Sequence, residues 1–125
     1  MAGRNDREEL RKRTKDFAIA ICRYAKKVPQ DDVSRVLVRQ LIRCGTGVGA
    51  NQRSARLAKS EADLLNKLKI VEEEADESGF WLELLGELGY SPGDDSVALA
   101  KEAYELRSIA TAGIKTLRKR LDAER

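Results

Sequence analysis

The sequence predicts an all-α protein, an antiparallel up-down-up-down four-helix bundle that fills residues 1–125 as a single domain. Apolar residues recur at alternating steps of three and four in four segments of the chain. Short connections that contain helix-breaking residues separate most of these segments. The composition agrees, because 36% charged and 5% aromatic residues suit a helical bundle better than a β-sandwich or a barrel.

The first two helices are expected at about residues 7–28 and 32–57. Pro29 ends the first one because proline cannot continue the hydrogen-bond ladder. Asp31 or Asp32 can supply the N-terminal cap of the second. The predicted apolar stripes are Leu10, Thr14, Phe17, Ile21, Tyr24 and Val28 in the first helix, and Val33, Val36, Leu37, Leu41, Cys44 and Val48 in the second.

The third helix is expected at about residues 60–88. Ser60 and Asp63 form a pattern similar to a capping box at its start. Gly89 stands where a C-terminal glycine is expected, and Pro92 follows it. The predicted stripe is Leu64, Leu68, Val71, Ala75, Ser78, Leu82 and Leu85.

The fourth helix is expected at about residues 95–122, with a cap among positions 94–96. Its stripe is Leu99, Ala103, Leu106, Ala110, Gly113 and Leu117. Short connections between helices of this length predict antiparallel neighbours that cross at shallow angles.

The chain contains no histidine, which removes the commonest general base and metal ligand. Cys22 and Cys44 lie beside apolar stripes, form no Cys-x-x-Cys motif and are expected to be buried structural residues. We therefore expect no catalytic residue, no metal and no cofactor. An enzyme that uses carboxylates or lysines is a weaker alternative.

No run of about 18 apolar residues is present, so we expect no membrane span. The first ten residues contain no apolar segment of the kind that secretory signals carry. The expected location is the cytoplasm, which also agrees with two cysteines that cannot form a disulfide framework.

Residues 45–50 nominally match the dinucleotide fingerprint G-x-G-x-x-A, but a helical segment precedes them instead of the strand that this motif requires. A packing role fits better: Gly45 and Gly49 lie on one side of a helix, where missing side chains let a neighbouring helix approach. Asn51 falls near the buried face of the same helix. We predict that its side chain makes a structural hydrogen bond where the second helix meets the third.

Residues 17–22 are six consecutive apolar residues that wrap the whole first helix. Residues 36–38 and 41–42 likewise extend the apolar surface beyond one face of the second helix. Scattered surface apolars are one interpretation; a subunit interface in a homo-oligomer is the favoured one. The candidate interface residues are Phe17, Ile19, Cys22, Val38 and Ile42.

Charge divides between the two halves of the chain, with a net +9 over residues 1–59 and −6 over residues 60–125. An arginine repeats every fourth residue in the second helix, residues 72–77 are acidic except for one alanine, and the last helix ends basic. The candidate nucleic-acid contacts are Arg35, Arg39, Arg43, Arg53, Lys115, Arg118 and Lys119. Phosphate would neutralise such a stripe. The alternatives are pairing with the acidic stretch, at Glu72, Glu73 or Asp76, and a solvated face of surface salt bridges.

Three segments occur in order: CGTGVGAN at residues 44–51, SEADLLNKL at 60–68 and FWLELL at 80–85. In these segments the chain resembles the small bacterial proteins encoded in intervening sequences of 23S rRNA genes. Gly49, Ala50 and Asn51 fall in that family's small-residue box, and Trp81 falls in its aromatic pair. The chain departs from the pattern at Gln52 and Ser54, where many relatives have an aromatic residue or Ile, and a Glu.

The resemblance implies an antiparallel four-helix bundle, commonly a ring-like homopentamer, in a family without an established enzymatic activity. The chain is similar too to accessory proteins of diversity-generating retroelements, whose pentameric barrels present a basic surface to nucleic acid and a reverse transcriptase. The expected partners are other copies of the chain, RNA or DNA, and a reverse transcriptase or another protein. Our leading hypothesis is a non-enzymatic oligomeric adaptor that binds RNA through basic helix surfaces. The alternative is a protein-binding scaffold whose basic stripe pairs with the acidic third helix and binds no nucleic acid.

Overall fold

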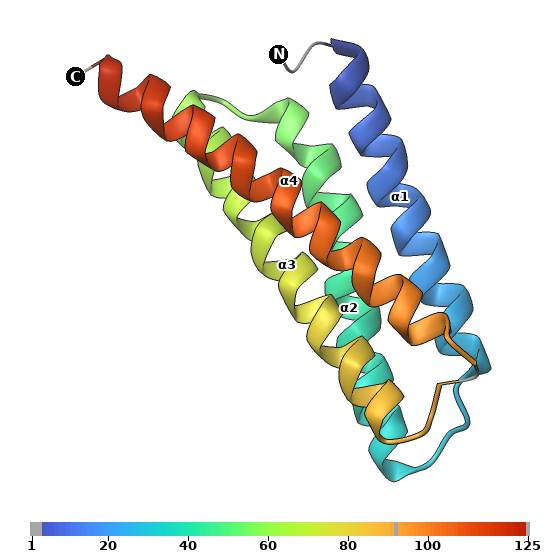
Figure 1. Cartoon of the computed structure of the whole chain (residues 1–125). Coiled ribbons are helices and arrows are strands. Elements are labelled where there is room, and N and C mark those ends of the chain that lie inside the picture. Colours follow the sequence, from blue (N-terminus) through green and yellow to red (C-terminus); the bar gives the residue numbers. More distant parts are fainter. Residues whose placement is uncertain (1–3, 92, 125) are drawn as a thin grey trace.

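The computed structural model describes residues 4–91 and 93–124, with side chains from Asp6 onward. Its elements are α1 (Arg4–Lys27), α2 (Asp32–Ser54), a short 3₁₀ helix η1 (Ala55–Leu57), α3 (Glu61–Glu87) and α4 (Asp95–Ala123). Each helix runs antiparallel to the next (Figure 1), which confirms the predicted all-α four-helix fold. No described helix carries an apolar stretch of the kind that crosses a lipid bilayer.

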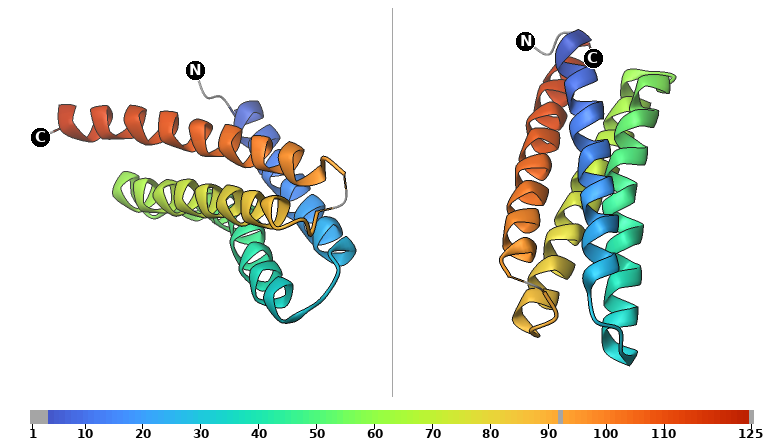
Figure 2. Two further views of the ribbon diagram at one scale, coloured as in Figure 1. Left: turned by 60° about the horizontal axis from the view of Figure 1, so that its bottom comes forward. Right: turned by 90° about the vertical axis from the view of Figure 1, so that its right-hand side faces the viewer.

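The four helices pack unevenly. The most extensive contact is between α3 and α4, and α2 packs on both α1 and α3. The contact between α1 and α4 is limited, because these helices diverge toward the ends that carry the chain termini (Figures 1 and 2). Ion pairs also join these two helices: Arg13 pairs with Glu102 and Glu105, and Lys27 with Asp95.

Local signals in the sequence set the helix ends. Asp31 caps α2: its carboxylate accepts hydrogen bonds from the backbone of Val33 and Ser34, and the Ser34 hydroxyl accepts one from the Asp31 N–H. Ser60 caps α3 by accepting from the Asp63 N–H at 3.0 Å. Gly89 has φ +82°, the left-handed conformation that favours glycine after a helix.

The stripes predicted for the first, third and fourth helices face the core, although Leu10, Leu64, Leu68, Leu99 and Gly113 are only half-buried. The stripe predicted for the second helix is partly wrong. Val33 and Val36 are 52% and 57% exposed, and Ser34 is fully buried in their place. Ser34 tolerates burial because its hydroxyl also donates to the Pro29 carbonyl at 2.7 Å. The predicted span 32–57 also divides, since the α-helix ends at Ser54 and one 3₁₀ turn completes it.

Candidate nucleic-acid interface

The arginine stripe of α2 does not act as one surface. Arg35 lies 3.2 Å from Asp32 at the start of its own helix. Arg43 is bound by α3, with Nη2 2.6 Å from Glu77 and Nη1 3.5 Å from Glu74. Arg39 is exposed and makes no ion pair with a described residue. Of the three stacked arginines, Arg39 is the one whose charge is left for an external partner.

The acidic run of α3 is divided between its two neighbours. On the α4 side, Glu72 accepts a hydrogen bond from the Thr111 hydroxyl, and Asp76 lies 2.7 Å from Arg107. The side chains that reach α2 come from Glu74 and Glu77 instead. The predicted pairing of the arginine stripe with Glu72, Glu73 or Asp76 was therefore wrong in its partners, because the helical turn sends residues three and four apart to the same side.

Tyr104 of α4 makes a further polar contact with α3. The Tyr104 hydroxyl donates to Glu83, and its ring lies over Gly79, where the α3 backbone has no side chain in the way. Burial, together with this carboxylate, raises the pKa of Tyr104 to about 12. Arg107 stacks on the same ring at 4.6 Å from its centroid. Tyr104 is thus a packing residue that stays protonated at neutral pH.

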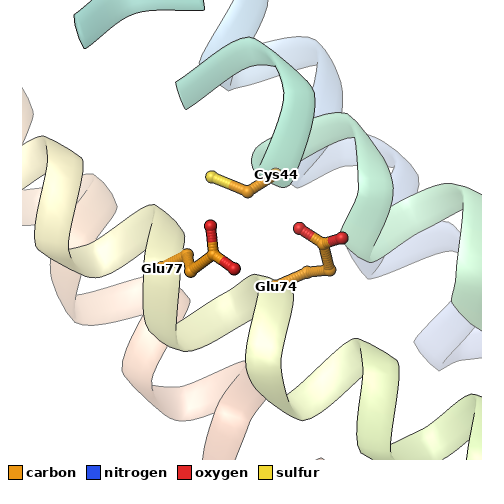
Figure 3. A group of neighbouring side chains, drawn as sticks. All are labelled: Cys44, Glu74 and Glu77. Atoms are coloured by element: carbon orange, nitrogen blue, oxygen red, sulfur yellow. The ribbon is translucent and has the colours of Figure 1, made fainter. Parts of the chain in front are cut away.

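Cys44, Glu74 and Glu77 form a group that could be taken for a metal site, with one donor atom of each within 4.8 Å of the others (Figure 3). Arg43 lies against both carboxylates and supplies one positive charge for the pair, 2.6 Å from Glu77 and 3.5 Å from Glu74. Burial raises the pKa of the Cys44 thiol, so the thiol is protonated at neutral pH, and its sulfur accepts a hydrogen bond from the Ser78 hydroxyl at 3.4 Å. The group is accounted for as the polar part of the α2–α3 contact.

Exposed cations without an ion pair lie near the C-terminal ends of α2 and α4, which are at the same end of the bundle (Figure 1). Arg53 of α2 and the α4 residues Lys115, Arg118 and Lys119 are exposed and make no ion pair with any residue that the structure describes. We call these four residues, with Arg56 and Lys59 from the α2–α3 connection, the basic end of the bundle. Sequence reasoning missed Arg56 and Lys59 because it followed helix faces, and these two lie in η1 and the loop after it. Their closeness to Arg53 in the chain was the available signal.

The glycines of the family box let α1 approach α2, as expected. A Cβ on Gly45 would lie 2.8 Å from Ile21, and one on Gly49 would lie 3.0 Å from the Thr14 carbonyl oxygen. Residues 45–50 are helical, so no strand-to-helix phosphate loop exists there. Ala50, between the glycines and Asn51, is exposed.

Asn51 makes the structural bond that was predicted, but in a different place. Its Nδ2 donates to the Gly47 carbonyl at 2.8 Å, so the bond stays within α2 and does not join α2 to α3. Trp81 is half-buried against the core, and its indole N–H is buried without a hydrogen-bond partner among the described residues.

One of the five predicted interface residues was wrong. Phe17 is 2% exposed and belongs to the core, because it lies on the inward face of α1 with Ile21. Ile19 and Ile42 are 39% and 36% exposed, and Cys22 and Val38 are half-buried. Cys44 is fully buried as expected, while Cys22 is less buried than expected.

The fold and its surface define a class, the small helical-bundle proteins that present charged helix exteriors. More narrowly, the chain belongs to the 23S rRNA-intervening sequence protein family, whose pattern matches residues 7–112. It is similar to the crystal structure of a protein of unknown function from the S23 ribosomal protein family of Bacteroides thetaiotaomicron, with 31% identity and a TM-score of 0.79. That match covers 87% of this chain and 97% of the other. No curated protein sequence matches the chain.

Proposed function

We propose that the chain is a non-enzymatic, cytoplasmic adaptor that assembles as a homo-oligomer, with a pentamer favoured, and binds RNA through its basic end. DNA is the alternative polyanion. The observation that carries the proposal is the set of exposed cations, none in an ion pair with a described residue, at the C-terminal ends of α2 and α4 and in the connection from α2 to α3. Phosphates would supply the missing counter-charge.

The binding mode follows from the chemistry of that surface. The basic end contains lysines and arginines and no aromatic residue on which bases could stack. Contacts would therefore fall on the phosphate backbone and depend weakly on sequence. In an oligomer each copy repeats the surface, so weak contacts of single chains combine into measurable avidity.

A protein-binding scaffold is the second candidate, and Arg43 favours it. Its pairing with Glu74 and Glu77 shows that part of the basic stripe already has its counter-charge within the chain. The scaffold hypothesis predicts no RNA binding at physiological salt. The adaptor hypothesis predicts binding that weakens steadily as salt rises.

The test compares two variants that lose the same charge. Arg53→Gln/Arg118→Gln removes two cations from the basic end, whereas Arg35→Gln/Lys101→Gln removes one paired and one unpaired cation elsewhere. We would measure anisotropy of a labelled hairpin RNA over a series of salt concentrations. The first variant should lower affinity and reduce the slope of log K against log salt by about 0.7–0.9 for each lost phosphate contact. Equal losses in both variants, or no binding by the unmodified protein, would refute the proposal.

A further inference from the structure

Phe80 is an exposed aromatic residue surrounded by acidic side chains. It lies on the outer face of α3 with 53% of its surface exposed, and it packs edge-on against Trp81 at 5.0 Å between ring centroids. Residues three, four and seven positions away are its neighbours on the helix surface. Five of these six neighbours carry a carboxylate: Glu73, Asp76, Glu77, Glu83 and Glu87. Glu73 and Glu87 make no ion pair with the residues described.

Ile19 on α1 has the opposite surroundings. It is 39% exposed, and its six surface neighbours on the helix are four cations (Lys12, Lys15, Arg23 and Lys26), Asp16 and Cys22. Lys12 lies 2.9 Å from Asp16 in an exposed pair, which a second carboxylate can join or replace. A surface hollow of about 570 Å³ lies beside it, between α1 and α4. Ile19, Ala20, Tyr24, Ala98 and Leu99 give this hollow an apolar wall, and its other lining residues are the charged Asp16, Arg23, Lys27 and Asp95. An aromatic ring could be buried there.

The two faces match in spacing as well as in charge. Glu73, Phe80 and Glu87 follow one another at seven-residue intervals on α3, and Lys12, Ile19 and Lys26 do the same on α1. At 1.5 Å per residue, both outer charges stand about 21 Å apart with the apolar residue midway. Within one chain no described Cα atom of α1 lies within 8 Å of one in α3, and both faces are exposed, so these faces can meet only between copies.

We propose that Phe80 of one copy inserts into the hollow beside Ile19 of a second copy, with Glu73 and Glu87 facing Lys12 and Lys26. This contact is the subunit interface of the proposed oligomer, so the inference rests on the proposed function. A second copy is favoured over another protein because both halves of the match are present on this chain. The contact is heterologous, so each copy donates α3 to one neighbour and receives α3 from another, and the assembly closes as a ring when the rotation allows.

Charge reversal tests the contact with residues that are all exposed. One variant carries Lys12→Glu and Lys26→Glu, and the other carries Glu73→Lys and Glu87→Lys. Each should sediment near the 14.0 kDa monomer in analytical ultracentrifugation, at a concentration where the unmodified protein is larger. An equimolar mixture of the two should recover a larger species, because each variant then offers the charge that the other needs. One chain with all four changes should recover it too.

Two controls separate this contact from general effects. Lys67→Glu/Lys101→Glu makes the same change in charge outside both the proposed contact and the basic end, and should keep the mass of the unmodified protein. Phe80→Ser should lower the mass without any change in charge, and circular dichroism should show unchanged helix content in every variant. High salt should also lower the mass of the unmodified protein.

The outcomes are distinct. If the reversed variants keep the mass of the unmodified protein, or if mixing restores nothing, this contact is wrong while the proposed oligomer and RNA binding remain. If the unmodified protein is monomeric at every concentration, both this contact and the oligomeric part of the proposed function are wrong. The anisotropy assay still decides RNA binding in that case.

Discussion

Arg13 provides the main polar connection between α1 and α4, the loosest pair of neighbours in the bundle. Its Nε donates to Glu102 Oε2 at 2.8 Å, and its Nη2 donates to Glu102 Oε1 at 2.6 Å and to Glu105 at 2.8 Å. This two-pronged geometry is the strong form of an arginine–carboxylate pair. We expect Arg13→Met to weaken the α1–α4 contact while keeping most of the packing of the side-chain stem.

The expected loss is modest because water screens the pair. The side chains of Arg13 and Glu102 are 39% and 29% exposed. Exposed pairs contribute about 0.2–1 kcal/mol, and a two-pronged pair lies at the upper end, so Arg13→Met should lower the free energy of unfolding by about 1 kcal/mol. The midpoint of thermal unfolding should fall by about 4 °C for a chain of this size.

The loss should also depend on pH. Hydrogen bonds from Arg13 hold the pKa of Glu102 below its ordinary value in the folded protein. A lowered pKa stabilises the fold at pH values above the unfolded pKa, and this stability is lost as the pH falls through the folded pKa. The difference between the unmodified protein and Arg13→Met should therefore be full at pH 7 and shrink below about pH 4.

Urea unfolding followed by circular dichroism at 222 nm measures these quantities. Lys15→Met, which removes an exposed cation that has no partner among the described residues, serves as the matched control and should leave stability unchanged. A double-mutant cycle with Glu102→Gln isolates the coupling between the two side chains. A coupling near zero, or a loss that is the same at pH 7 and pH 3, would refute this account of the α1–α4 contact.

Four further substitutions test the packing and its side-chain hydrogen bonds. Gly49→Ala should destabilise the protein by about 1–3 kcal/mol in thermal melts, because its Cβ would press on the backbone of α1; Gly113→Ala has ordinary space at 3.5 Å and should stabilise it by up to about 1 kcal/mol. Equal effects at the two glycines would contradict the close approach. Ser34→Ala should cost about 1–2 kcal/mol in urea unfolding, because it removes the hydroxyl that bonds the Pro29 carbonyl and the Asp31 N–H. Asn51→Ala should lower stability by about 1 kcal/mol and leave RNA affinity unchanged; the reverse result would make Asn51 a binding residue.

The ion pairs that α3 makes with α2 and α4 show why the partners of some charged residues could not be predicted from the sequence. Residues 72–77 were recognisable as acidic, and the basic stripe of α2 as needing counter-charge. The sequence did not reveal that Glu74 and Glu77 reach α2 while Asp76 reaches α4. Such pairs join residues about 30 positions apart in the sequence. They therefore depend on the axial register in which two neighbouring helices pack.

The sequence by itself determined the four helices, the N-terminal caps of α2 and α3 and most of the buried face. Helical periodicity relates residues three and four apart, and capping involves residues within one turn. Both can therefore be recognised from residues that are close together in the sequence. The tertiary structure decided that Phe17 belongs to the core, that Val33 and Val36 lie outside it, and that the basic ends of α2 and α4 lie at the same end of the bundle. These outcomes depend on the direction from which neighbouring helices cover each face, which is set by contacts between distant parts of the chain.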